Sequence, residues 1–212
     1  MPMVDTVVGI AFYAVVVLAM LTALRAVAAG REPSPPRPSA AAVGLWLVVA
    51  VPSLVQLAVP ELLPALERDA GLIRAGQVWR LVTSAVVQDG GLVGTVSNLV
   101  ILAIAVVAAE RYWGGRRTWV TFWVAVVGAD LLVLGVEPVG GGNSMATLAL
   151  ACAVASNALA SPSRRWAWPP AVGVLVAVGV IVAAGNYHAV ACALGLLLGL
   201  VPPRGPRTDS SA

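Results

Sequence analysis

Residues 93–109 read VGTVSNLVILAIAVVAA, a run of 17 residues without a single charged side chain. A helix of about 20 predominantly apolar residues spans the hydrocarbon core of a bilayer, so this stretch and its flanks predict a transmembrane helix. The whole chain has the same character: hydrophobic residues make up 59% of its 212 residues, charged residues 11%, and the mean hydropathy is +0.91. Soluble domains carry about 25% charged residues. The composition therefore predicts an α-helical protein embedded in lipid.

Six further apolar runs accompany the first one. They cover about residues 6–29, 41–59, 118–136, 145–160, 170–185 and 189–201. Seven spans of about 20 residues would use about 140 residues, which leaves only short loops. We therefore expect a single all-α polytopic bundle, without a second folded domain.

The connections between the runs suggest how the chain is divided. Residues 1–29 are expected to form an N-terminal transmembrane helix. Residues 30–40 contain four prolines and cannot continue that helix, so they predict a cytoplasmic linker. The remaining runs form one domain over residues 41–203, with a long extracytoplasmic loop at 61–92. Residues 204–212 are expected to form a cytoplasmic tail.

The arginines indicate the orientation of the spans. All 13 basic residues are arginine, and ten of them follow the first, third, fifth and seventh runs. Because cytoplasmic loops carry the excess of basic residues, this alternation predicts an N-terminus outside and a C-terminus in the cytoplasm. Basic residues scattered in this way do not predict a nucleic-acid partner. The absence of lysine and the abundance of Ala, Val, Gly and Arg are typical of a high-GC bacterial genome, so we expect the bacterial cytoplasmic membrane.

Two polar residues begin predicted spans at the same membrane level. Ser144 follows the glycines at 140–142, and His188, the only histidine of the chain, opens the last run. Each has a simpler interpretation, Ser144 as a helix N-cap and His188 as an interfacial residue. The fifth and seventh spans both run inward in the predicted topology, however, so the two side chains would lie at similar depth.

Small residues favour contact between these two spans. In lipid, faces of small residues let helix backbones approach closely. Small residues share one predicted face with each polar group: Ala151, Ala155 and Ala158 with Ser144, and Ala191, Gly195 and Gly199 with His188. The two helices are therefore expected to pack together and to bring Ser144 and His188 within hydrogen-bonding distance.

A serine beside a neutral histidine can attack a peptide carbonyl while the imidazole takes the hydroxyl proton. The developing oxyanion needs donors. The backbone amide of Ser144 is one candidate, and the side-chain amide of Asn98 is another, although Asn98 could equally make a helix-to-helix hydrogen bond. Asp130 is better interpreted as a structural polar contact. The chain contains no metal-ligand spacing and no nucleotide-binding motif, so neither a metal nor another cofactor is expected.

Several segments together resemble the rhomboid family of intramembrane serine proteases. They are the G-x-x-W-R-x-x-T segment Gly76–Thr83, the spaced residues Asn98, Glu110, Gly114 and Arg117, the segment Gly142-Asn143-Ser144, and His188 with Ala191, Gly195 and Gly199. The resemblance covers roughly residues 41–201. It implies a six-helix core with one extra N-terminal helix, a Ser144–His188 dyad, an oxyanion site at Asn98 and Ser144, and a structural loop motif at Trp79 and Arg80.

The implied activity is endopeptidase cleavage of transmembrane protein substrates. Three positions depart from the family pattern: Met145 replaces a glycine after the nucleophile, Gly94 replaces a histidine that assists the oxyanion, and Leu148 replaces an aromatic residue beneath the catalytic histidine. These departures keep a second interpretation open, in which the protein is catalytically inactive and binds transmembrane clients. A transporter or channel is a third interpretation, although the spans lack the repeated ionisable residues typical of ion pathways.

Overall fold

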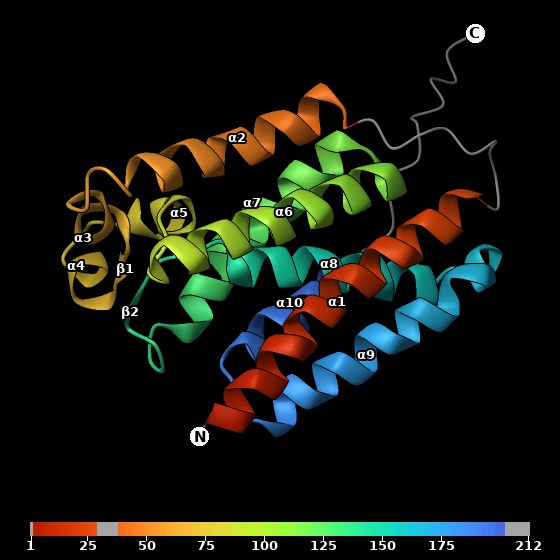
Figure 1. The fold of residues 1–212 in the computed structure, drawn as a ribbon. Helices are drawn as coiled ribbons and strands as arrows, with labels where there is room; N and C mark the ends of the chain where they lie inside the picture. The colour runs from red at the N-terminus through yellow and green to blue at the C-terminus, as the bar shows by residue number, and fades with distance from the viewer. Residues whose placement is uncertain (1, 29–37, 202–212) are drawn as a thin grey trace, which may run out of the picture.

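Helices dominate the computed structural model of the chain, which describes residues 2–28 and 38–201 (Figure 1). Within that part, seven helices of 13 or more residues follow the order of the seven predicted runs. They are α1 (Pro2–Ala28), α2 (Ala40–Val55), α6 (Gly91–Trp113), α7 (Gly115–Val133), α8 (Ser144–Leu159), α9 (Trp168–Ala183) and α10 (His188–Leu200). The prediction of a helical chain is confirmed. Most of the predicted linker at 30–40 and the whole tail at 204–212 lie outside the described residues.

Three helical segments in the described part are long and apolar enough to cross a membrane. They are Thr6–Ala28, Gly91–Trp113 and Arg165–Ala183, while α2, α8 and α10 are apolar but shorter. These segments indicate a membrane protein. Passage of all seven helices through the bilayer stays a prediction.

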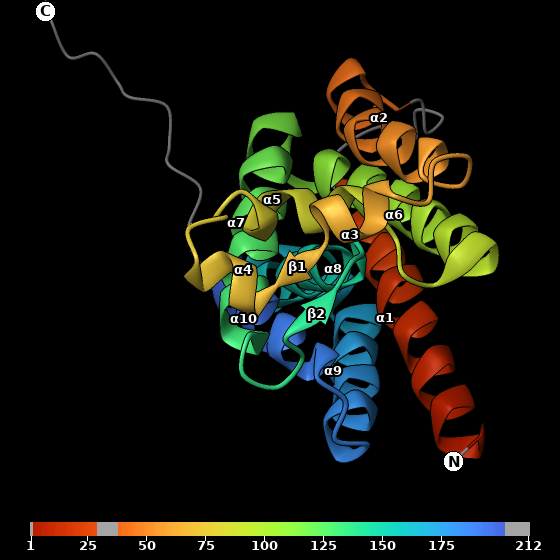
Figure 2. The same ribbon diagram turned by 90° about the vertical axis from the view of Figure 1, so that its left-hand side faces the viewer.

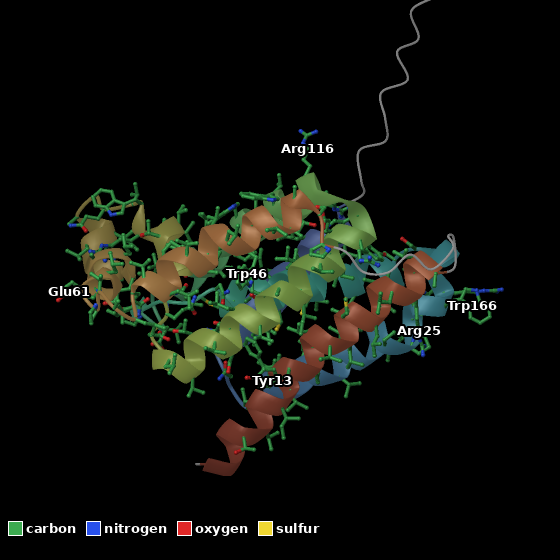
Figure 3. All side chains as sticks on the ribbon, turned by 45° about the horizontal axis from the view of Figure 1, so that its top comes forward. Tyr13, Arg25, Trp46, Glu61, Arg116 and Trp166 are labelled. Atoms are coloured by element: carbon green, nitrogen blue, oxygen red, sulfur yellow. The ribbon has the colours of Figure 1, made fainter. Side chains whose placement is uncertain are left out.

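The chain runs up and down between two ends of the bundle. At one end, α6 ends at Trp113 and α7 begins at Gly115, and the residue between them, Gly114, has a φ of 91°, a conformation that favours glycine. At the opposite end lie the N-termini of α8 and α10, beside a small strand pair (Figure 1). Arg25 and Trp166 lie at the opposite end of the molecule from Glu61 (Figure 3).

Helix α8 lies at the centre of the bundle, where it packs against α1, α6, α7, α9 and α10 (Figure 2). All residues from 145 to 156 are buried. Many of them are alanine or another small residue, which lets neighbouring helices approach from every side. A helix that is apolar all round is expected in the interior of such an assembly.

The closest approach joins α8 and α10. A Cβ atom added to Gly195 would lie 2.2 Å from the carbonyl oxygen of Ala149, and one added to Gly199 would lie 2.3 Å from that of Ala153. The predicted small-residue face of α10 is therefore confirmed. On α8 the closest approach runs along Ala149 and Ala153 instead of the predicted Ala151, Ala155 and Ala158, because an alanine-rich helix offers small residues on every face.

The long connection between α2 and α6 is folded. It contains α3 (Leu62–Leu66), β1 (Arg68–Asp69), α4 (Ala70–Arg74), α5 (Arg80–Thr83) and the 3₁₀ helix η1 (Ser84–Val86). Strand β1 pairs antiparallel with β2 (Val139–Gly140), which immediately precedes the glycine segment leading into α8. The loop thereby lies against the N-terminus of α8.

Arg80 holds this loop together from its interior. Its side chain is only 5% exposed, and its guanidinium donates to the carbonyl oxygens of Pro64 and Glu67 at 3.0 and 2.7 Å and to Oε1 of Gln77 at 2.8 Å. The neighbouring Trp79 is 53% exposed. Of the two residues predicted as a loop motif, Arg80 therefore makes the internal contacts and Trp79 lies on the surface.

Helix α1 is part of the packed bundle. It lies against α6, α8 and α9, and Val15, Val16 and Ala19 are completely buried in these contacts. Figure 1 shows α1 running alongside α9 at the edge of the bundle. This placement brings the N-terminal half of α1 near the start of α10.

Candidate active site

Ser144 and His188 meet at the N-termini of two adjacent helices. Ser144 is the first residue of α8 and His188 the first residue of α10. The Ser144 Oγ atom lies 3.0 Å from Nε2 of His188, which is within the range expected for a nucleophile and its general base. The close approach along Gly195 and Gly199 holds the two helix starts at this separation.

Three side chains surround the imidazole of His188. Oδ1 of Asn186 lies 2.8 Å from Nδ1, on the ring edge away from Ser144. The ring of Tyr187 stacks on the imidazole, with centroids 4.3 Å apart and an interplanar angle of 28°. Phe12 of α1 meets it edge to face at 5.5 Å and 81°. The imidazole therefore has a polar partner on each side and aromatic contacts from both α1 and its own chain neighbour.

Gly142 leaves a small space beside the Ser144 hydroxyl. Its φ of 146° favours glycine, and a Cβ atom added there would lie 3.4 Å from Oε1 of Gln88, 3.7 Å from Nδ2 of Asn98 and 3.8 Å from Oγ of Ser144. The side chain of Asn98, on α6, thus reaches the same space as Ser144. A negatively charged oxygen in this space would find the Asn98 amide and the N–H groups of the first turn of α8, which have no acceptor within their own helix.

Gln88 holds the Asn98 amide in place. Its Oε1 atom accepts a hydrogen bond from Nδ2 of Asn98 at 2.8 Å, and its Nε2 donates to Oγ of Ser53 at 3.1 Å. The backbone of Gln88 exchanges two further hydrogen bonds of 2.7 Å with the side chain of Gln56. Gln88 is 1% exposed. Each polar atom of its amide is therefore satisfied by a partner on α2 or α6.

A polar cavity of about 20 Å³ adjoins Ser144 and has room for about one water molecule. Its walls come from the long loop, the connection between α7 and α8, the first residues of α8 and the residue before α10: Arg68, Ser84, Asp89, Glu137, Gly140, Gly141, Gly142, Ser144, Met145 and Tyr187. Burial, followed by the carboxylates of Asp89 and Glu137, raises the pKa of the Tyr187 phenol. Tyr187 therefore stays protonated and neutral at physiological pH.

A buried ion pair beside this cavity joins the long loop to α7. The guanidinium of Arg68 lies 2.5 Å from Oδ1 of Asp130 on α7, and the Ser84 hydroxyl donates to Oδ2 of the same carboxylate at 2.5 Å. Nε of Arg68 also donates to the carbonyl oxygen of Glu137 at 3.1 Å. Asp130 thus makes the structural contacts predicted for it.

Sequence reasoning missed Asn186, Gln88 and Phe12. The position of Asn186, two residues before the only histidine, was the one available signal. Gln88 and Phe12 reach the site from distant parts of the chain, and nothing in their local sequence points to it. Within residues 2–28 and 38–201, no group of three His, Cys, Asp or Glu side chains could hold a metal ion. Comparison with family models, with curated proteins and with solved structures gave no match.

Proposed function

We propose that this protein is a rhomboid-type intramembrane serine endopeptidase that cleaves transmembrane protein substrates. The observation that carries the proposal is the 3.0 Å contact between Oγ of Ser144 and Nε2 of His188. Asn98 and Ser144, which both adjoin the small space at Gly142, support a site for the oxyanion. The six-helix core would consist of α2 and α6 to α10, with α1 as the extra helix.

The proposed reaction follows the general chemistry of acyl transfer. Oγ of Ser144 attacks the carbonyl carbon of the scissile peptide bond while Nε2 of His188 takes the hydroxyl proton. The oxyanion accepts hydrogen bonds from the Ser144 backbone N–H and from Nδ2 of Asn98. The C–N bond then breaks, the amine leaves with the proton from His188, and water hydrolyses the acyl-serine in the same way.

Activated serines react with fluorophosphonates, so covalent labelling tests the proposal without knowledge of the substrate. The purified chain in detergent is expected to take up one fluorophosphonate, at Ser144, as identified by mass spectrometry. Ser144→Ala and His188→Ala should abolish labelling. Ser161→Ala is the matched control, because the Ser161 hydroxyl only donates to the carbonyl oxygen of Asn157 at the other end of α8. Absence of labelling in the wild type, or equal labelling of Ser144→Ala, would reject the proposal.

A second candidate is an inactive rhomboid-like protein that binds transmembrane clients. Two observations favour it. Met145 is 6% exposed directly beside the nucleophile, where it narrows the site, and Gly94 has no side chain to add an oxyanion donor beyond Ser144 and Asn98. Under this interpretation the folded wild-type chain is not labelled, although it still co-purifies with a membrane client.

We further propose a multi-pass location in the bacterial cytoplasmic membrane, with the N-terminus outside and the C-terminus in the cytoplasm. The arginine distribution and the three apolar helices support it. Reporter fusions test the orientation: a green fluorescent protein fused after residue 212 should fluoresce, and an alkaline phosphatase fused there should be inactive. The reverse result would contradict the topology.

A further inference from the structure

We infer that Asn186 is a positioning residue that holds His188 in the single tautomer able to accept the Ser144 proton. The inference rests on the proposed function for its catalytic meaning, and it adds a third member to the Ser144–His188 pair. Asn186 immediately precedes Tyr187 and α10, so it belongs to the same short segment as the histidine that it contacts.

The backbone N–H of His188 identifies which atom of the Asn186 side-chain amide faces the histidine. The N–H of His188 donates to Oδ1 of Asn186 at 3.0 Å. A backbone N–H is always a donor, so the amide atom opposite it must be the oxygen, and an exchange of the amide oxygen and nitrogen is excluded. The orientation of Asn186 therefore follows from a group whose protonation does not change.

The Oδ1 atom of Asn186 then determines which ring nitrogen of His188 carries the proton. Oδ1 of Asn186 also lies 2.8 Å from Nδ1 of His188, and an amide oxygen can only accept. Nδ1 must carry the proton, and in a neutral imidazole Nε2 then has a free lone pair. Nε2 faces Oγ of Ser144 at 3.0 Å, so the serine hydroxyl donates to it. This is the direction of proton transfer that nucleophilic attack needs.

The ring contacts keep the imidazole in this orientation. Tyr187 stacks on one face and Phe12 meets the ring with its edge, so the imidazole cannot rotate without breaking aromatic contacts. The simpler role of Asn186 is an Asx turn, in which Oδ1 only accepts from the His188 N–H at the start of α10. The experiment must separate that structural role from control of the tautomer.

The single histidine of the chain makes the tautomer directly measurable. The full chain, purified in detergent through an affinity tag without histidine, is labelled with ¹⁵N-histidine, and NMR of the ring nitrogens at high pH reports one residue. The expected wild-type spectrum has a protonated Nδ1 and a bare Nε2. A wild-type spectrum with the proton on Nε2 would overturn the inference.

Two substitutions test the role of the side chain. Asn186→Ser keeps a short oxygen acceptor for the backbone N–H but does not reach Nδ1, and it should shift the ring towards the Nε2–H tautomer. Asn186→Asp keeps an acceptor at both positions and should retain Nδ1–H. Ser161→Ala is the control, because it removes a side-chain hydrogen bond to the carbonyl oxygen of Asn157 at the other end of α8 and should leave the ring unchanged. An unchanged tautomer in Asn186→Ser would show a structural role only.

Fluorophosphonate labelling provides the functional readout. Asn186→Ser should lower the labelling rate by about 10- to 100-fold, a part of the 10²- to 10⁴-fold that a general base contributes, and Asn186→Asp should restore it. The carboxylate that Asn186→Asp introduces would also favour the protonated imidazolium form of His188. The labelling rate of that variant should therefore begin to fall at a higher pH than the labelling rate of the wild type when the pH is lowered. The other titratable side chains near the serine, Arg68, Asp89, Glu137 and Tyr187, line the cavity beside Ser144 and stay the same in all variants.

The two readouts separate this inference from the proposed function. A wild-type ring with Nδ1–H that depends on Asn186, without any labelling of Ser144, rejects the peptidase and keeps the positioning role. Labelling of Ser144 that is equal in the wild type and Asn186→Ser keeps the peptidase and rejects the positioning role.

Discussion

Asn98 contributes a fixed amide to the candidate site because Gln88 is itself fixed. The Gln88 side chain and backbone together make four hydrogen bonds, to Asn98, Ser53 and Gln56. Buried amides with satisfied partners have little freedom to reorient. Nδ2 of Asn98 carries a second N–H beyond the one donated to Gln88, and that N–H is available to an oxyanion beside Gly142.

Replacement of Asn98 by alanine should therefore slow reaction at Ser144 while leaving the protein folded. Loss of one oxyanion donor costs about 10²- to 10³-fold in rate, and we expect that reduction in the rate constant for fluorophosphonate labelling. Ser161→Ala, which removes a hydrogen bond to the carbonyl oxygen of Asn157 within the end of α8, is the control and should label at the wild-type rate. Equal rates for Asn98→Ala and the control would remove Asn98 from the oxyanion site.

At the scale of elements, the candidate site depends on how closely α8 and α10 approach. Gly195 and Gly199 have no room for a Cβ atom, because the backbone of Ala149 and Ala153 occupies that position. Ser156 strengthens the contact by donating to the carbonyl oxygen of Leu196 at 2.6 Å. The distance between the two helices at Ser144 and His188 thus depends on contacts that lie farther along α8 and α10.

Gly195→Ala should destabilise the protein, whereas Gly179→Ala should not. The added methyl at 195 must push α10 away from Ala149, and overpacking of this kind costs about 1–3 kcal/mol. Gly179 lies on α9 with no atom within 4 Å of an added Cβ, so alanine there gains up to about 1 kcal/mol of helix propensity. Thermal unfolding followed by circular dichroism in detergent measures both. Equal melting temperatures of the two variants would show that the contact between α8 and α10 tolerates an added methyl group at position 195.

At the scale of the whole molecule, a buried ion pair joins the folded loop to the bundle. Arg68 belongs to β1 and Asp130 to α7, and both side chains are about 5% exposed or less. Through Ser84, the carboxylate also holds the segment that leads towards Gln88. Loss of this connection would affect the cavity above Ser144 as well as the stability of the fold.

Asp130→Ala should lower the free energy of unfolding by about 3–5 kcal/mol, because it leaves the Arg68 charge buried without a partner. The double variant Arg68→Met with Asp130→Leu should recover part of the loss, since neither side chain is then charged. Glu61→Ala, at an exposed carboxylate of the same loop, should change stability by no more than about 0.5 kcal/mol. Unfolding in mixed micelles provides the comparison. A decrease in the free energy of unfolding as small as that of Glu61→Ala would contradict the prediction, since it would mean that water solvates the Arg68 charge.

Much of the fold was accessible from local patterns, while the contacts that build the site were not. The apolar runs predicted all seven long helices in order, and the depth argument predicted that Ser144 would meet His188. The face that α8 presents to α10 was predicted wrongly, because its alanines look alike on every side. Gln88 was missed because its partners Gln56 and Asn98 lie 32 and 10 residues away, beyond the reach of any helical periodicity.

The sequence by itself determined that the chain is helical, where its seven long helices lie and that it belongs in a membrane, because hydropathy and helix-breaking residues act locally. Only the tertiary structure decided that the long loop folds against α8, that α1 packs into the bundle with Phe12 at His188, and that Asn186 faces Nδ1. These features depend on pairs of residues far apart in the chain or on the rotation of one side chain. Local sequence patterns did not reveal these particular contacts, since the distance between two segments and the orientation of a side chain arise only when the helices pack.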